Sequence, residues 1–189
     1  MKGFSILQLT LSGLLIAVGV VIPMVSPLKI VLEPASFTLA SHVAIFIAMF
    51  ISPRITASVV IGTAIGFFLG GFPIVVVFRA ASHIIFAMLG ALYLNKARKD
   101  DISIVKLRVF SFIIALIHAS GELIIVSVFY FGGIMNTPYY QNGFITSVLL
   151  LVGLGTVIHS IVDFEIAQVI MLPLKDILIR YSTFAYRKS

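Results

Sequence analysis

The sequence contains no cysteine, which excludes disulfide bonds, thiol catalysis and cysteine-ligated metal sites. Several motifs of known enzyme chemistry are also missing. There is no G-x-x-x-x-G-K-[ST] phosphate loop, no G-x-S-x-G nucleophile turn and no H-E-x-x-H zinc motif. We therefore predict that the chain is not an enzyme, does not hydrolyse a nucleotide through a phosphate loop, and carries no cofactor or metal.

Charged residues are also scarce: they make up 11% of the 189 residues, whereas 60% are hydrophobic. Soluble domains average about 25% charged and about 45–50% apolar residues. The apolar runs are continuous, and do not alternate with polar residues as in a β-barrel. Because helices satisfy their own backbone hydrogen bonds in lipid, the composition predicts an all-α membrane protein.

Polar, glycine-containing and proline-containing segments divide the chain into six apolar runs. A membrane-spanning helix needs about 20 apolar residues, within a range of about 17–25. We predict six transmembrane helices in a single membrane domain over residues 1–189, without an internal repeat. We expect the first run to be a retained span, because no small-x-small signal-peptide cleavage site follows it cleanly. The predicted helices are 6–25, 35–51, 55–69, 74–94, 107–131 and 144–172.

The basic residues predict which helix ends face the cytoplasm, because Lys and Arg gather in cytoplasmic loops. With the N-terminus inside, eleven of the thirteen basic residues fall on the inner side. The outer loops then hold only Lys29, and Arg79 lies within the membrane. Both termini are therefore predicted to be cytoplasmic. The net charge of +6 follows from this topology and from attraction to anionic membrane lipid, without a nucleic-acid partner.

Three predicted helices carry a histidine and a charged residue four positions apart, which places both side chains on one helix face. An ionisable group at a helix centre in lipid costs at least ~2.5 kcal/mol, so each needs a structural or functional reason. We expect these faces to turn towards one another. The pairs are Arg79/His83, His118/Glu122 and His159/Asp163.

Depth in the membrane separates these residues into two groups. At ~1.5 Å of rise per residue, Arg79 lies ~7 Å below the outer end of its helix, and His83 and Glu122 lie ~13 Å below theirs. His159 lies ~22 Å and Asp163 ~28 Å down. We therefore predict a ligand pocket that opens outwards and contains Arg79, His83 and Glu122, with His159 and Asp163 outside it, towards the cytoplasm.

Other interpretations of these residues remain open. Arg79 could offer its donor fork to a ligand carboxylate or phosphate, or it could form an internal ion pair with Glu122. His118 and His159 could simply satisfy hydrogen bonds between helices. The His and carboxylate pairs could also serve an intramembrane enzyme, through a metal or acid–base chemistry, or the proton relay of an autonomous transporter.

The predicted outer loops could complete the pocket. The loop at 26–37 is unusually apolar for a solvated segment, so it could close over the pocket as a lid and bring Lys29 or Glu33 to the ligand. Tyr139 and Asn142, in the loop before the last helix, are further candidates for ligand binding. Aromatic walls could come from Phe72, Phe78, Tyr130, Phe131, Tyr139 and Tyr140.

Small residues recur at spacing four on three of the predicted helices, a pattern that lets helix backbones approach closely. On the third helix, internal packing is the simpler interpretation. The positions are Gly13/Ala17, Gly62/Gly66/Gly70 and Ala87/Ala91.

Taken together, six helices in 189 residues, an apolar first outer loop and Gly13/Ala17 resemble the S-components of energy-coupling factor (ECF) vitamin transporters. The segments ASFTLASHVAIFIAMFISPR (Ala35–Arg54) and GGFPIVVVFRAASHIIFAMLGALYL (Gly70–Leu94) are most similar to the niacin-type S-components. Members commonly carry Ala-xxx-Ala on the first helix. In this chain Gly13 replaces the first alanine.

The resemblance implies a function and a set of partners. It implies that the chain sits in a bacterial cell membrane and captures a small vitamin from outside, with Arg79 holding the carboxylate of niacin. His83 or Glu122 would sense the ring nitrogen. It also implies that Gly13 and Ala17 dock on a transmembrane coupling subunit, and that two cytosolic ATPases supply the energy. Another vitamin or precursor is the alternative substrate.

Overall fold

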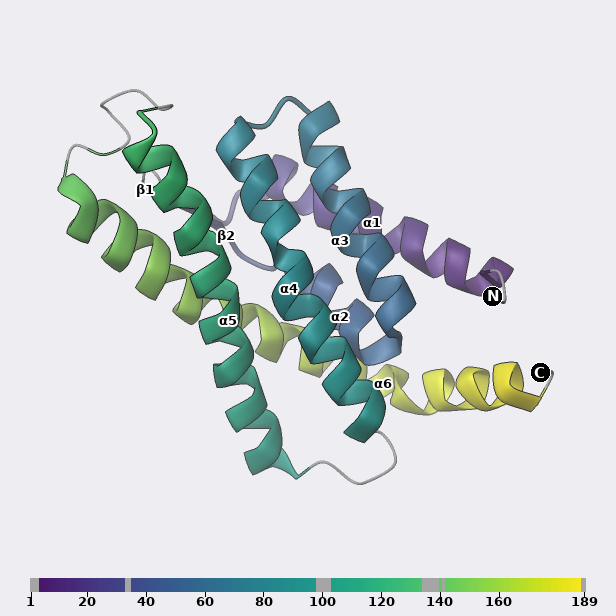
Figure 1. Ribbon diagram of the computed structural model, residues 1–189. Helices are drawn as coiled ribbons and strands as arrows, with labels where there is room; N and C mark the ends of the chain where they lie inside the picture. Colours follow the sequence, from purple (N-terminus) through teal and green to yellow (C-terminus); the bar gives the residue numbers. More distant parts are fainter. Residues whose placement is uncertain (1–3, 33–34, 98–102, 134–139, 141, 188–189) are drawn as a thin grey trace.

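A computed structural model describes residues 4–32, 35–97, 103–133, 140 and 142–187 (Figure 1). It consists of helices with a single small β-hairpin between the first two. The elements are α1 (Ile6–Val25), β1 (Lys29–Leu32), β2 (Ala35–Thr38), α2 (Val43–Ile51), α3 (Pro53–Leu69), α4 (Ile74–Ala97), α5 (Ile104–Phe131), the π-helix η2 (Ile145–Leu154) and α6 (Gly155–Arg187).

Serine residues begin three of these helices. The Ser5 hydroxyl accepts a hydrogen bond from the Gln8 backbone N–H, and the Gln8 side chain accepts one from the Ser5 N–H, so α1 starts with a complete capping box. Ser52 caps α3 directly before Pro53, which is favoured at the first helical position because it needs no N–H partner there. Ser103 caps α5 in the same way.

The predicted helix over 35–51 is wrong in its first half. Ala35–Thr38 is a strand that pairs antiparallel with Lys29–Leu32, and the helix occupies only Val43–Ile51. Between them Ala40 adopts φ 68°, which no helix residue does. The error arises because a continuous apolar run does not distinguish a buried strand from a helix.

Four helical segments are long and apolar enough to cross a membrane: Ile6–Val25, Ile74–Ala97, Ile104–Phe131 and Ile145–Met171. The apolar helix α3 has 17 residues and α2 has nine. Large hydrophobic side chains such as Ile85, Leu116 and Ile158 point outwards on these elements. Apart from the hairpin, the described residues are thus helical as predicted and contain six α-helices, and four helical segments rather than six are long and apolar enough to cross a membrane.

The close packing of α3 against α1 depends on two glycines of α3. A side chain at Gly62 would meet Ile16 of α1, and one at Gly66 would meet Val20. Ala87 and Ala91 of α4 are fully buried. The internal-packing interpretation is thus confirmed for Gly62 and Gly66, whereas Gly70 is exposed and caps the end of α3. Gly13 and Ala17 differ, because both are exposed and nothing among the described residues lies within 4 Å of a side chain built on Gly13.

The short helix α2 lies at the centre of the bundle. It contacts α1, α3, α4 and α6. Phe46 of α2 is fully buried and packs against Phe86 of α4 and Phe164 of α6, with ring centroids 5.8 and 5.3 Å away. This packing fixes the start of α2, where His42 lies, relative to the helices that carry the other ionisable residues.

Candidate functional site: a polar cavity beneath the β-hairpin

A cavity of about 200 Å³ lies between the hairpin and the helices. Strand β2 borders it with Ala35–Thr38, and α2 to α6 all contribute side chains. Arg79, His83 and Glu122 line this cavity, as does Lys29, which is exposed. The predicted pocket residues are therefore brought together, and the segment after α1 borders the cavity as expected for a cover. Glu33 lies outside the described residues.

The Glu122 carboxylate is the centre of a buried polar network. Its Oε2 accepts hydrogen bonds from an Arg79 guanidinium N–H at 2.8 Å and from the Thr156 hydroxyl at 2.6 Å. Its Oε1 lies 3.2 Å from His83 Nε2 and 3.6 Å from His118 Nε2. The predicted Arg79–Glu122 ion pair thus forms, and both partners also border the cavity.

Asp163 forms a second network at the start of α2. Its two carboxylate oxygens accept the backbone N–H groups of Ala40 and His42, each at 2.8 Å. Oδ2 also lies 3.2 Å from His42 Nδ1 and 3.3 Å from His159 Nε2. The Ser41 hydroxyl lies 3.0 Å from His159 Nε2. One carboxylate on α6 therefore holds the turn between the hairpin and α2.

The placement of His159 away from the pocket is wrong, because His159 lines the same cavity as Arg79. Asp163 does not line the cavity, as predicted, but it is bonded to His42, which does. The depth calculation assumed a straight α-helix. Residues 145–154 instead form a π-helix, which packs more residues into each turn and so advances less per residue. In addition, α6 runs at a steep angle to α4 and α5 (Figure 1).

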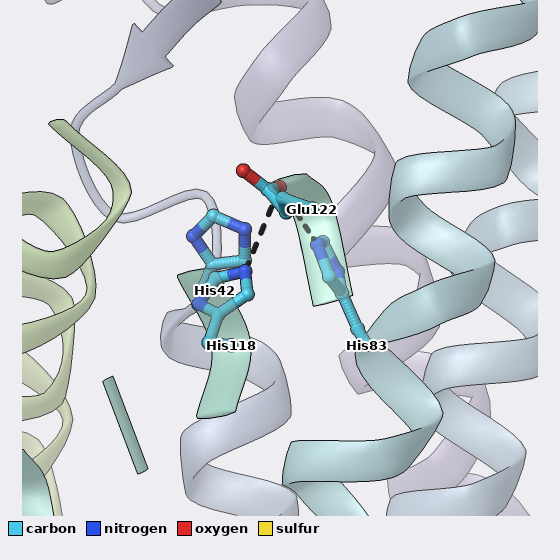
Figure 2. Close-up of side chains that lie close together, drawn as sticks. All are labelled: His42, His83, His118 and Glu122. Atoms are coloured by element: carbon cyan, nitrogen blue, oxygen red, sulfur yellow. Dashed lines mark hydrogen bonds and ion pairs between the residues drawn. The ribbon is translucent and has the colours of Figure 1, made fainter. Parts of the chain in front are cut away.

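All four histidines of the sequence meet at this point. The His42 ring centroid is 4.9 Å from that of His83, 4.7 Å from His118 and 5.0 Å from His159. Figure 2 shows the imidazoles of His42, His83 and His118 beside the Glu122 carboxylate. His42, His83, His118 and Glu122 each place one potential metal-ligand atom within 4.8 Å of the others.

The aromatic wall of the cavity differs from the predicted one. Phe72 lines it, together with Phe37 and Phe67, which the sequence interpretation missed. Phe67 and Phe72 stack with ring centroids 4.5 Å apart. A signal for Phe37 was available, since it lies in the apolar segment predicted as a cover. Phe67 looks like any other apolar residue of α3.

The other predicted aromatic residues lie elsewhere. Phe78 and Phe131 are 49% and 73% exposed, and Tyr130 and Tyr140 pack against each other and line no part of the cavity. Asn142 is exposed and does not border the cavity either. Tyr139 lies outside the described residues.

Comparison with known proteins gives this geometry a context. The niacin transporter NiaX of Lactococcus lactis subsp. cremoris (strain MG1363) is 38% identical over 167 residues, which are 88% of this chain and 73% of that protein. The chain belongs to the niacin transporter family. No protein-family model and no solved structure matches it.

Membership of the niacin transporter family settles two of the open interpretations. The relative is named as a transporter, so the chain is not an enzyme and the intramembrane-enzyme alternative is excluded. The resemblance to niacin-type proteins, based on Ala35–Arg54 and Gly70–Leu94, is confirmed. Together with the four apolar helices, the relationship indicates a multi-pass membrane transporter.

Proposed function

We propose that this chain is the substrate-binding S-component of an ECF-type importer and captures niacin in the cavity beneath the hairpin. The observation that carries the proposal is the position of Arg79. It is a buried cation that borders a small cavity in a member of the niacin transporter family.

The chemistry of the cavity suits a flat aromatic ring with one carboxylate. Arg79 is bonded to Glu122, and its Nε–H is buried without a hydrogen-bond partner, so a ligand carboxylate brought against it would supply the missing acceptor. Lys29 adds a second cation. Phe37, Phe67 and Phe72 offer apolar surface to the ring. At about 200 Å³ the cavity is below the ~300–1,000 Å³ of pockets for drug-sized ligands, which favours a single-ring molecule.

Groups that could recognise the pyridine nitrogen lie around the same cavity. Thr63 lines it, and its hydroxyl is buried without a partner. His83 and His159 border it as well. A hydroxyl or a protonated imidazole nitrogen can donate to the ring nitrogen. Niacin would then be bound at both ends, by its carboxylate and by its ring.

The proposed topology has six membrane crossings with both termini in the cytoplasm of a bacterial cell. Helix α2 is too short to cross alone, so the hairpin and α2 would complete one crossing together. Non-helical backbone is tolerated at membrane depth where it is covered by protein or lines a cavity. The hairpin satisfies this condition because β2 borders the cavity and Ala35 is buried.

Partners would supply the energy for import. The sequence has no phosphate-loop motif, so a transmembrane coupling subunit and two cytosolic ATPases would drive uptake. The exposed Gly13/Ala17 face of α1 is the proposed docking surface for the coupling subunit.

One observation favours a second function, that of an autonomous proton-coupled transporter. The four histidines, Glu122 and Asp163 form a continuous set of contacts that could relay protons. Uptake by proteoliposomes containing only this chain, abolished when the proton gradient is collapsed, would support this function and contradict the proposed dependence on ATPases.

The test of the proposal is a titration of the purified full-length chain with nicotinate, nicotinamide and a panel of other vitamins. We expect tight binding of nicotinate and weaker binding of nicotinamide, which lacks the carboxylate. Cells expressing the chain should take up nicotinate only when the coupling subunit and ATPases are co-expressed. Absence of nicotinate binding, or preference for another vitamin, would contradict the niacin assignment.

A further inference from the structure

Three imidazoles and one carboxylate converge at the inner side of the cavity with the geometry of a metal site. His83 comes from α4, His118 and Glu122 from α5, and His42 from the residue before α2. His83, His118 and Glu122 are 5%, 1% and 2% exposed. No other histidine competes for an ion except His159, because the sequence has only four.

Hydrogen bonds engage one nitrogen of two of the rings and leave the other nitrogen of each ring without a hydrogen-bond role. The Asp163 carboxylate only accepts, so its contact with His42 Nδ1 at 3.2 Å places the proton on Nδ1 and leaves Nε2 with a free lone pair. Ser160 Oγ lies 3.2 Å from His118 Nδ1 and can fix that ring in the same way. A carboxylate or hydroxyl behind an imidazole is the usual second layer of a metal site.

In the absence of a bound ion, the burial of His118 Nε2 has no structural explanation. It is buried and has no hydrogen-bond partner, and at 3.6 Å from Glu122 Oε1 it is too far for a hydrogen bond. An unsatisfied buried polar atom costs about 1–3 kcal/mol. A cation between Nε2 and the carboxylate oxygen would give Nε2 a partner, and it would replace the hydrogen bond that Glu122 Oε1 shares with His83 Nε2.

The distances between donor atoms fit a tetrahedral ion. With metal–ligand bonds of about 2.0–2.1 Å, two ligands of a tetrahedral Zn²⁺ site lie about 3.4 Å apart. Glu122 Oε1 is 3.2 Å from His83 Nε2 and 3.6 Å from His118 Nε2. All four donor atoms lie within 4.8 Å of one another, so the rings would close around an ion by small movements.

The charged groups around the site are compatible with a bound divalent ion. Arg79 bonds Oε2 of Glu122, whereas the histidines face Oε1, so an ion can bind one oxygen while the ion pair stays on the other. With a divalent ion present, the positive charge of the ion and Arg79 would exceed the negative charge of Glu122 and Asp163 by one unit. An anionic ligand in the adjoining cavity would balance that excess.

We propose that His42, His83, His118 and Glu122 form a binding site for a divalent transition-metal ion, with Zn²⁺ as the ion that best suits three imidazoles and a carboxylate. His42, His83 and Glu122 also line the cavity, so the ion would lie at its wall. The site would bind metal whether or not the cavity holds niacin.

A second ligand set, His42, His159 and Asp163, shares one histidine with the first. It is the weaker candidate because both Asp163 oxygens already accept backbone N–H groups. His159 belongs only to this second set. Replacing it therefore provides a matched control for the four-residue site.

The experiment measures metal bound to the full-length chain, purified without a polyhistidine tag and stripped with a chelator. Isothermal titration with Zn²⁺ in the absence of niacin should give about one ion per chain. His118→Gln should weaken Zn²⁺ binding at least tenfold, whereas His159→Ala should leave the stoichiometry unchanged. Co²⁺ should give the visible spectrum of a tetrahedral site in the wild type and not in His118→Gln.

A folding control distinguishes a variant that has lost the metal site from a variant that does not fold. Zn²⁺ should raise the thermal unfolding midpoint of the wild type and leave that of His118→Gln unchanged. If His118→Gln does not fold, Ser160→Ala keeps every ligand and should still weaken Zn²⁺ binding about tenfold, since it removes a supporting hydrogen bond. Wild-type protein that binds no Zn²⁺, or binding that survives His118→Gln and is lost in His159→Ala, would overturn the proposal.

Discussion

At the scale of single residues, the Arg79–Glu122 pair determines how the cavity can be tested. Both side chains are buried, so removing one of them would leave the other charge uncompensated. Breaking a buried ion pair in this way costs about 3–5 kcal/mol. A simple Arg79→Ala substitution would therefore mix loss of binding with loss of folding. Neutralising both partners together avoids this problem.

We predict that the double variant Arg79→Gln, Glu122→Gln folds but binds nicotinate about tenfold to a hundredfold more weakly than the wild type. This factor corresponds to a free energy of about 1.5–3 kcal/mol, the contribution of a hydrogen bond to a charged group. Calorimetric titration of the wild type and the double variant with nicotinate gives the comparison. Asn142→Ala, at an exposed position away from the cavity, is the control for unaffected binding. Equal affinities of the wild type and the double variant would show that Arg79 does not hold the carboxylate.

At the scale of elements, the junction between the hairpin and α2 depends on a residue more than a hundred positions away. Asp163 accepts the N–H groups of Ala40 and His42, with sequence separations of 123 and 121 residues. The hydrophobic pattern of residues 35–51 contains no trace of this contact. The pattern therefore predicted one continuous helix, whereas the α6 carboxylate stabilises a turn.

We predict that Asp163→Asn lowers the free energy of unfolding by about 1–3 kcal/mol. The amide keeps the shape but directs an N–H₂ group at a backbone donor, which leaves buried polar groups unsatisfied. The matched control is Glu165→Gln in the same helix, whose partner Arg108 is 58% exposed. A surface pair of this kind contributes about 0–1 kcal/mol. Thermal unfolding of both variants in detergent measures the difference, and equal midpoints would contradict the role given to Asp163.

The same comparison shows what the sequence could predict about the site. Spacing of four along α4 and α5 places Arg79, His83 and Glu122 in one cavity, because those helices are regular. Reasoning from spacing and helix rise fails for His159, whose position depends on the π-helix at 145–154 and on the angle of α6. It also fails for His42, because the contact between α2 and α6 that brings His42 to Asp163 is tertiary.

At the scale of the whole molecule, the absence of cysteine makes the topology directly measurable. Single cysteines can be introduced without a background of native thiols. Lys96 and Asn142 are suitable positions because both are exposed. If the basic residues mark the cytoplasmic side, these two positions lie on opposite sides of the membrane.

We predict that Asn142→Cys reacts with a membrane-impermeant maleimide added to intact cells, whereas Lys96→Cys reacts only after the membrane is opened. Transport activity of each variant serves as the control for correct folding. Labelling of Lys96→Cys in intact cells would contradict the proposed orientation. It would also place the cavity, which lies beneath the hairpin, on the wrong side for capture from outside.

Two glycines of the neighbouring helices α1 and α3 differ in what surrounds them. Gly62 of α3 faces Ile16 of α1, whereas Gly13 of α1 faces open space. Gly62→Val should overpack this contact and destabilise the chain by about 1–3 kcal/mol. Gly13→Val should leave the unfolding midpoint and nicotinate affinity unchanged, since nothing described within the chain touches it.

In the complete importer, however, Gly13→Val should reduce nicotinate uptake and co-purification of the coupling subunit, because close approach of two helices requires small residues at their contact. Two measurements on Gly13→Val decide the question: the nicotinate affinity of the isolated chain, and nicotinate uptake by cells that express all partners. A selective loss of uptake identifies α1 as the docking surface. Unchanged uptake by Gly13→Val and by Ala17→Val would mean that the coupling subunit docks on another face, and the exposed small residues of α1 would then simply face lipid.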